Sequence, residues 1–227
     1  MAERAVMARA LVGEFLGSAL LAVVVVGSGI AAASLSPNDV GLQLLENAFA
    51  TALGLAVLIL VFASVSGAHF NPVVTLVDAA LHGARPSAVA SYIPVQIVGC
   101  VAGAVLANVL FDVSFAWSTT DRASVPRLVS EVVATWGLVL VIFALVRTGR
   151  SHLAAPAVGA YIGAAYFFTS STSFANPAIT VGRAFSDTFA GIAPASVLPF
   201  IGAQLLGGAI GWATVRLLFP RPQPAVG

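Results

Sequence analysis

Two Asn-Pro pairs carry the most specific polar chemistry in this sequence. They begin the segments NPVVT at Asn71 and NPAIT at Asn176. Asn is a favoured N-cap and Pro is well placed at the first helical position, so each pair predicts the start of a short helix. A helix N-terminus is partly positive, and an Asn amide offers N–H donors. The two pairs therefore predict helix ends that oppose cations and donate hydrogen bonds to a passing neutral oxygen.

Two glutamates lie in otherwise apolar segments. They are Glu14 in EFLGS and Glu131 in EVVAT. An ionisable residue in such a segment has a functional role by default, and a proton relay is one interpretation. The other is a buried brace that accepts hydrogen bonds from the loops before the short helices. We favour the brace because both halves carry it at the same place. His69, two residues before Asn71, is interpreted as a residue of the cytoplasmic vestibule.

The elements that position these residues are membrane helices. The chain has 227 residues, of which 59% are hydrophobic and only 8% charged, whereas soluble domains carry about 25% charged residues. Long apolar runs favour helices over the short alternating strands of a barrel. The sequence predicts an all-α membrane protein forming one channel domain over 1–227, with six spans and two short re-entrant half-helices. The predicted spans are 15–38, 47–68, 86–111, 128–146, 153–182 and 188–215.

The two halves of the chain repeat each other. The Glu segments, the Asn-Pro boxes and the segments QIVGCVAG and QLLGGAIG recur in the same order. Three spans per half is an odd number, so the repeat over 126–219 is expected to insert upside down relative to the repeat over 8–112. Inverted repeats place their site near the bilayer midplane. The half-helices would then meet there by their N-termini. Asp78 and Arg183 are equivalent in the repeats, and the pattern assigns them no function.

The arginines predict the orientation. With a retained first helix and a cytoplasmic N-terminus, both termini lie inside an inner (plasma) membrane. Seven of the ten basic residues are then cytoplasmic, as the positive-inside rule expects. These seven are Arg4, Arg9, Arg85, Arg147, Arg150, Arg216 and Arg221, and the other three are Arg122, Arg127 and Arg183.

Three function classes fit a protein of this kind. A passive channel for small uncharged solutes explains the paired Asn-Pro boxes. A secondary carrier with inverted repeats would need an ion or proton site, and only the two symmetric glutamates are available for it. An intramembrane enzyme would need a nucleophile, metal or paired-Asp site, and no such pattern is present. The sequence indicates no enzyme, cofactor, metal or nucleic-acid partner.

The order of these motifs resembles the aquaporin (major intrinsic protein) family from Glu14 to Gly211. The resemblance implies six spans, two half-helices, one pore per subunit and a homotetramer in the lipid bilayer. The two pore boxes are then Asn71-Pro72-Val73 and Asn176-Pro177-Ala178. They depart from the family pattern at Val73, where Ala is usual, and at Ile179, where Arg is usual.

The resemblance also implies an extracellular selectivity filter of four residues. By distance from the two Asn residues, these are Thr51, Ala164, Ser173 and Ile179. None is aromatic or charged, so we expect an opening wider than one water and amphipathic through its two hydroxyls. Aromatic bulk from a loop residue remains an alternative. A filter without Arg at this position resembles the atypical bacterial aquaporin S branch, which implies passage of glycerol-like solutes, arsenite, organoarsenicals and water. The alternative is an ordinary water or glycerol channel.

Overall fold

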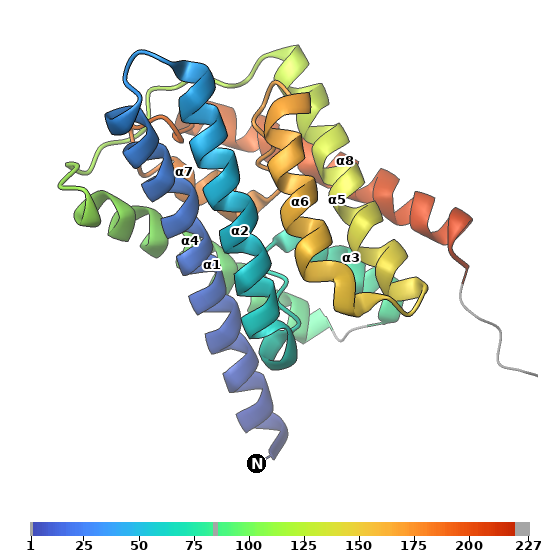
Figure 1. Cartoon of the computed structure of the whole chain (residues 1–227). Coiled ribbons are helices and arrows are strands. Elements are labelled where there is room, and N and C mark those ends of the chain that lie inside the picture. Colours follow the sequence, from blue (N-terminus) through green and yellow to red (C-terminus); the bar gives the residue numbers. More distant parts are fainter. Residues whose placement is uncertain (1, 84–85, 221–227) are drawn as a thin grey trace, which may run out of the picture.

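The computed structural model describes residues 2–83 and 86–220, and every regular element in those ranges is a helix. Figure 1 shows the long helices arranged as a tilted bundle around two short ones. The elements are α1 (Ala2–Leu35), α2 (Val40–Ser66), α3 (Pro72–His82), α4 (Pro86–Leu110), α5 (Val125–Arg147), the 3₁₀ turn η1 (Ser151–Leu153), α6 (Ala154–Phe168), α7 (Pro177–Arg183) and α8 (Pro194–Leu218). The all-α architecture predicted from the sequence is confirmed.

The helix boundaries follow from local chemistry. Asp39 caps α2 by accepting a hydrogen bond from Leu42 N at 2.9 Å. Gly67 ends this helix with φ 87°, a left-handed conformation that glycine adopts without penalty. The half-helices α3 and α7 begin at Pro72 and Pro177, each behind an Asn N-cap, as predicted.

Five helices in the described ranges are long and apolar enough to cross a membrane: α1, α2, α4, α5 and α8. The charge-free run 153–182 is not one span, and that boundary prediction is wrong. Helix α6 has 15 residues and ends at Phe168, because a loop and the second Asn-Pro box follow. At 1.5 Å per residue it is about 22 Å long, so the fifth predicted span is short for a hydrocarbon core of about 30 Å. The turn η1 extends it at its N-terminal end.

The two halves pack in the same way and interlock. Helix α1 packs against α2 and α4, while α5 packs against α6 and α8. The half-helices cross between the halves, since α3 contacts α8 and α7 contacts α1 and α4. Close approach depends on glycine. A Cβ at Gly103 would lie 2.0 Å from Ala19 O, and one at Gly207 would lie 2.4 Å from Val132 O.

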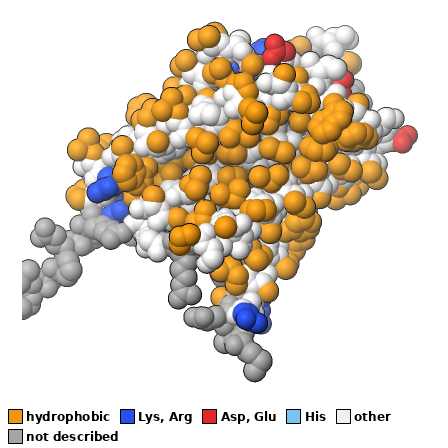
Figure 2. Space-filling model, turned by 180° about the vertical axis from the view of Figure 1, so that it is seen from behind, with side chains coloured by type: hydrophobic (Ala, Val, Ile, Leu, Met, Phe, Trp, Pro, Cys, Tyr) orange, Lys and Arg blue, Asp and Glu red, His pale blue; other side chains and the backbone are white. Residues whose placement is uncertain are grey.

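The outer surface suits lipid. Figure 2 shows hydrophobic side chains covering most of one face, with charged side chains toward its ends. Large apolar residues such as Leu53, Val57 and Leu60 are exposed on α2, and in a multi-pass membrane protein this surface contacts lipid or other subunits. Of the seven arginines predicted to be cytoplasmic, Arg85 and Arg221 lie outside the described residues.

Candidate functional site: a central cavity between two half-helices

The two Asn-Pro boxes meet head to head. The Asn71 side chain accepts a hydrogen bond from Val73 N at 2.9 Å through Oδ1 and donates to Ala175 O at 2.8 Å through Nδ2. Asn176 does the same in the other half, accepting from Ala178 N at 2.9 Å and donating to Phe70 O at 2.8 Å. Each asparagine therefore caps its own half-helix and ties it to the loop of the other. One amide hydrogen of each Nδ2 remains for the cavity that both residues line.

The loops before the boxes have an unusual backbone. Ala68 and Phe70 have φ of 52° and 49°, and Ser173 and Ala175 have φ of 50° and 49°. A left-handed conformation costs a residue with a Cβ about 1–2 kcal/mol, so the surroundings must hold these loops in place.

Glu14 holds the first loop. Its Oε1 accepts from Ser66 Oγ at 2.7 Å and His69 N at 3.0 Å, and its Oε2 accepts from Phe70 N and Gln96 Nε2, both at 2.7 Å. The carboxylate is fully buried. Four hydrogen bonds to a charged acceptor offset much of the cost of burying it.

Glu131 holds the second loop in the same way. It accepts from Phe174 N and Ala175 N, both at 2.9 Å, and from Gln204 Nε2 at 2.6 Å. Gln204 Nε2 also donates to Thr180 Oγ1 at 2.8 Å on the half-helix. These are the contacts that the brace interpretation requires, and both glutamates lie outside the cavity lining.

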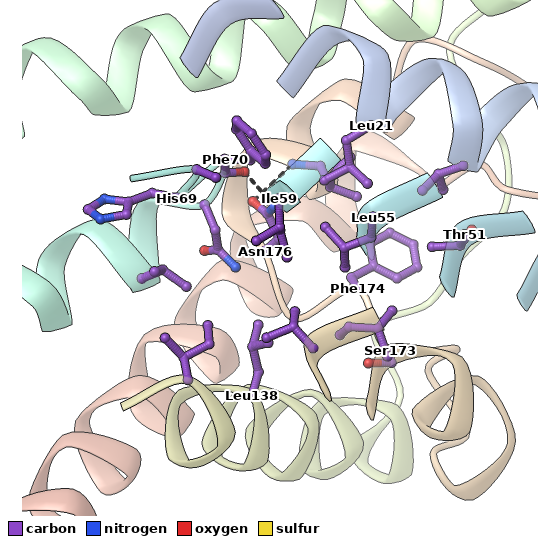
Figure 3. Close-up of a pocket in the computed structure, with 18 of the residues that line it drawn as sticks. Leu21, Thr51, Leu55, Ile59, His69, Phe70, Leu138, Ser173, Phe174 and Asn176 are labelled. Atoms are coloured by element: carbon purple, nitrogen blue, oxygen red, sulfur yellow. Dashed lines mark hydrogen bonds between the residues drawn. The ribbon is translucent and has the colours of Figure 1, made fainter. Parts of the chain in front are cut away.

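A cavity of about 60 Å³ lies between the half-helices and the long helices, with room for several water molecules. In Figure 3, His69 and Thr51 lie toward opposite ends of it, with Asn176 between them. A second hollow of about 350 Å³ lies beyond His69 and shares six lining residues with the first, so the two are adjacent. The shared residues are Ile59, Ala68, His69, Val74, Ile142 and Val158.

Three of the four predicted filter residues line this cavity: Thr51, Ser173 and Ile179. Thr51 Oγ1 lies 3.1 Å from the hydroxyl of Tyr166, which also lines the cavity. Ser173 Oγ is buried and has no hydrogen-bond partner in the described ranges. A buried hydroxyl without a protein partner is suited to bind a solute or water.

The fourth filter prediction, Ala164, is wrong. Ala164 is exposed and does not line the cavity, whereas Val158, Ile162 and Tyr166 on the same helix do. These three recur every fourth residue and so share one face of α6. At 100° per residue, Ala164 lies about 160° from that face. Counting back from Asn176 misplaced it, because the count does not fix the rotation of α6.

The sequence analysis assigned no pore role to several cavity residues, among them Tyr166, Phe174 and Arg183. The cavity that Thr51 lines therefore contains an aromatic ring from a loop, which is the alternative that the sequence left open, and an arginine that the filter prediction did not include. The width of the opening remains a prediction. Arg183 is 3% exposed and lies inside the protein, and its place among the extracellular arginines stays a prediction. One signal was available, because Ile179 and Arg183 are four residues apart and share a helix face.

His69 lines both the central cavity and the adjacent hollow. Its role in a cytoplasmic vestibule stays a prediction. Its Nδ1 lies 3.1 Å from Thr75 Oγ1, and its ring lies 5.7 Å from that of Tyr92. These contacts fix the ring between the two adjacent cavities that it lines.

A central cavity in a helical membrane protein, with two capped half-helices meeting beside it, indicates a channel. The comparisons with known proteins give the family: the profile of the major intrinsic protein family matches residues 1–175, so the chain belongs to that family of passive channels, which are not enzymes. The chain is similar to an aquaglyceroporin, AqpS, of Rhizobium meliloti, with 42% identity over 97% of this chain and 94% of the relative.

Two further comparisons agree with the family. Aquaporin Z of Rhodopseudomonas palustris is 30% identical, with 94% of each chain covered. Among solved structures, the aquaglyceroporin from Plasmodium falciparum superposes with a TM-score of 0.69. That comparison covers 92% of this chain and 95% of the other at 18% identity, and it supports the fold alone.

Proposed function

We propose that this channel passes small uncharged solutes larger than water: glycerol-like polyols, arsenite as its neutral hydroxide and small organoarsenicals, together with water. The observation that carries the proposal is the mixed lining around Thr51. The hydroxyls of Thr51 and Ser173 share the cavity with the aliphatic side chains of Leu55 and Ile179. A solute with both hydroxyl and hydrocarbon surface satisfies both kinds of lining.

Rejection of cations has a separate basis. No Asp or Glu is among the residues that line the central cavity in the described ranges. The free amide hydrogens of Asn71 and Asn176 offer donors, and an ion stripped of water there gains no carboxylate partner. Neutral solutes pay no comparable desolvation penalty.

The similarity to a protein named an aquaglyceroporin supports passage of polyols. Three aromatic side chains that line the cavity support the second candidate: Phe70, Tyr166 and Phe174. Their bulk favours a narrower pore and thus an ordinary water or glycerol channel. Relative permeability separates the two.

The experiment is stopped-flow uptake in proteoliposomes, comparing water with glycerol and arsenite. The variant is Ile179→Arg, and Ile179→Val is the matched control that keeps an apolar side chain of similar shape. The parent and Ile179→Val are expected to pass all three solutes. Ile179→Arg is expected to lower the ratio of glycerol and arsenite flux to water flux by about tenfold, because a long cationic side chain fills the cavity.

Exclusion of glycerol and arsenite by the parent would overturn the substrate assignment. Equal ratios in the parent and Ile179→Arg would show that position 179 does not set selectivity.

We also propose that the channel works as a homotetramer in the inner (plasma) membrane with both termini cytoplasmic. The exposed apolar surface supports burial against lipid and neighbouring subunits, and the distribution of arginines supports the orientation. Cross-linking of purified protein tests the assembly, and labelling of single cysteines added near either terminus tests the orientation.

A further inference from the structure

Arg183 is a buried cation whose donors are mostly free. Its Nε donates to Ala190 O, while Nη1 and Nη2 have no hydrogen bond in the part of the chain that the structure describes. No carboxylate there forms an ion pair with it, since the one such pair is His82–Asp78. A guanidinium has five N–H donors, so four remain next to the cavity that Arg183 lines.

Phe174 positions this guanidinium. The Arg183 Cζ lies 3.4 Å from the centroid of the Phe174 ring, within the range of a cation–π contact. The ring is held in turn by Phe200, whose centroid is 5.2 Å away in an edge-to-face arrangement. Glu131 accepts the Phe174 backbone N–H at 2.9 Å. The ring, and the cation on it, are therefore fixed from two sides.

Arg122 lies near the same ring but is used differently. Its Cζ is 5.2 Å from the Phe174 centroid, and it donates from Nε to Gly191 O at 2.7 Å and from Nη2 to Phe189 O at 3.1 Å. It does not line the cavity. Burial lowers the pKa of Arg122 to about 10, so it is charged at pH 7 and serves as a matched buried arginine.

We propose that Arg183, stacked on Phe174, supplies the fixed positive charge and the hydrogen-bond donors of the selectivity region, in place of the arginine that residue 179 lacks. The proposal rests on the proposed function and names a specificity-determining pair for it. Arg183 lies one helical turn beyond Ile179 on the same face of α7. Ile179 thus leaves room for the solute, while Arg183 binds its hydroxyl oxygens and repels cations.

The test compares Arg183→Gln with Arg122→Gln in proteoliposomes. Three quantities are measured: folded protein by size-exclusion chromatography, the ratio of glycerol to water permeability, and sodium leak under a potential. For Arg183→Gln we expect sodium leak per channel to rise by about tenfold or more. The buried positive charge of Arg183 repels a cation strongly in a low-dielectric pore, and the variant removes this repulsion. The glycerol-to-water ratio is expected to change at least about threefold. Arg122→Gln is expected to lower folded yield while leaving both transport quantities within about twofold.

The inference is overturned if Arg183→Gln folds and has the same sodium leak and the same glycerol-to-water ratio as Arg122→Gln. If Arg183→Gln does not insert, Arg183→Lys and Phe174→Leu decide. Arg183→Lys keeps the charge and should retain sodium exclusion. Arg183→Lys removes the planar guanidinium, and Phe174→Leu removes the ring that holds it, so each variant should shift the glycerol-to-water ratio at least about threefold. Unchanged ratios in both would refute the proposal.

The parent channel separates this inference from the proposed function. A parent that excludes glycerol and arsenite refutes the substrate assignment, whereas the sodium leak of the Arg183 variants still reports on the fixed charge. A parent that passes them, with no effect of the Arg183 and Phe174 variants, refutes the inference alone.

Discussion

Replacing Glu131 with Gln tests whether the intramembrane glutamates are braces. The best placement of the new amide keeps its oxygen toward Ala175 N and Gln204 Nε2, which now contact Oε2 at 2.9 and 2.6 Å. The NH2 group then faces Phe174 N, whose 2.9 Å hydrogen bond is lost. Losing one charge-assisted hydrogen bond costs about 1.5–3 kcal/mol, and leaving a buried N–H unpaired costs about 1–3 kcal/mol.

Removing a buried charge offsets part of this loss. We therefore expect the free energy of unfolding to fall by about 3 kcal/mol. The matched control is Glu46→Gln. Glu46 is also a helix carboxylate and is partly buried, but it accepts one hydrogen bond, from Ser36 Oγ at 2.9 Å. A Gln oxygen can replace that acceptor, so the expected change is within about 0.5 kcal/mol.

The assay is thermal unfolding in detergent, followed by glycerol uptake per incorporated channel at pH 6 and pH 8. The brace account expects a lower melting temperature for Glu131→Gln and no pH dependence of uptake in the parent. Equal stability of Glu131→Gln and Glu46→Gln would refute it. Uptake that requires titration of Glu131 would instead support the proton relay.

Two further variants test the pore centre and the packing. Replacing both Asn71 and Asn176 with Asp places carboxylates where the half-helices meet, and should raise sodium conductance of the inserted protein at least about tenfold; an unchanged conductance would contradict the electrostatic account. Gly103→Ala puts a Cβ 2.0 Å from the carbonyl oxygen of Ala19 and should abolish most folded protein, while Gly202→Ala meets nothing within 4 Å and should leave yield unchanged. Equal yields of the two variants in a size-exclusion assay would show that the helices adjust to the extra atom.

Much of the fold could be predicted because its causes are local or periodic. Apolar runs long enough for a bilayer predicted helices in lipid. Asn before Pro predicted the two half-helix starts, since capping involves only neighbouring residues, and both begin there. The repeated glutamate and Asn-Pro boxes predicted that corresponding residues have corresponding contacts. Glu14 and Glu131 do bind the backbone of equivalent loops.

The cavity wall was less predictable because it depends on the rotation of helices and the path of loops. Ala164 was chosen by counting along the chain, but the packing of α6 against α2 and α5 turns Ile162 and Tyr166 inward instead. Ala164 and the inward-facing residues lie about 160° apart around the axis of α6, and no local sequence signal determines which face turns toward the cavity.

The sequence by itself determined that this protein lies in lipid, that it is helical, where its two half-helices begin, and that position 179 is Ile where the family usually has Arg. Only the tertiary structure decided that Arg183 and Phe174 come together at the cavity. Left-handed residues in the loop before Asn176 help to place Phe174 beside the pore, and α7 is oriented so that Arg183 stacks on its ring. Those positions depend on contacts between segments far apart in the chain, such as that of Phe174 N with Glu131. Contacts of this kind have no signature in composition, spacing or capping.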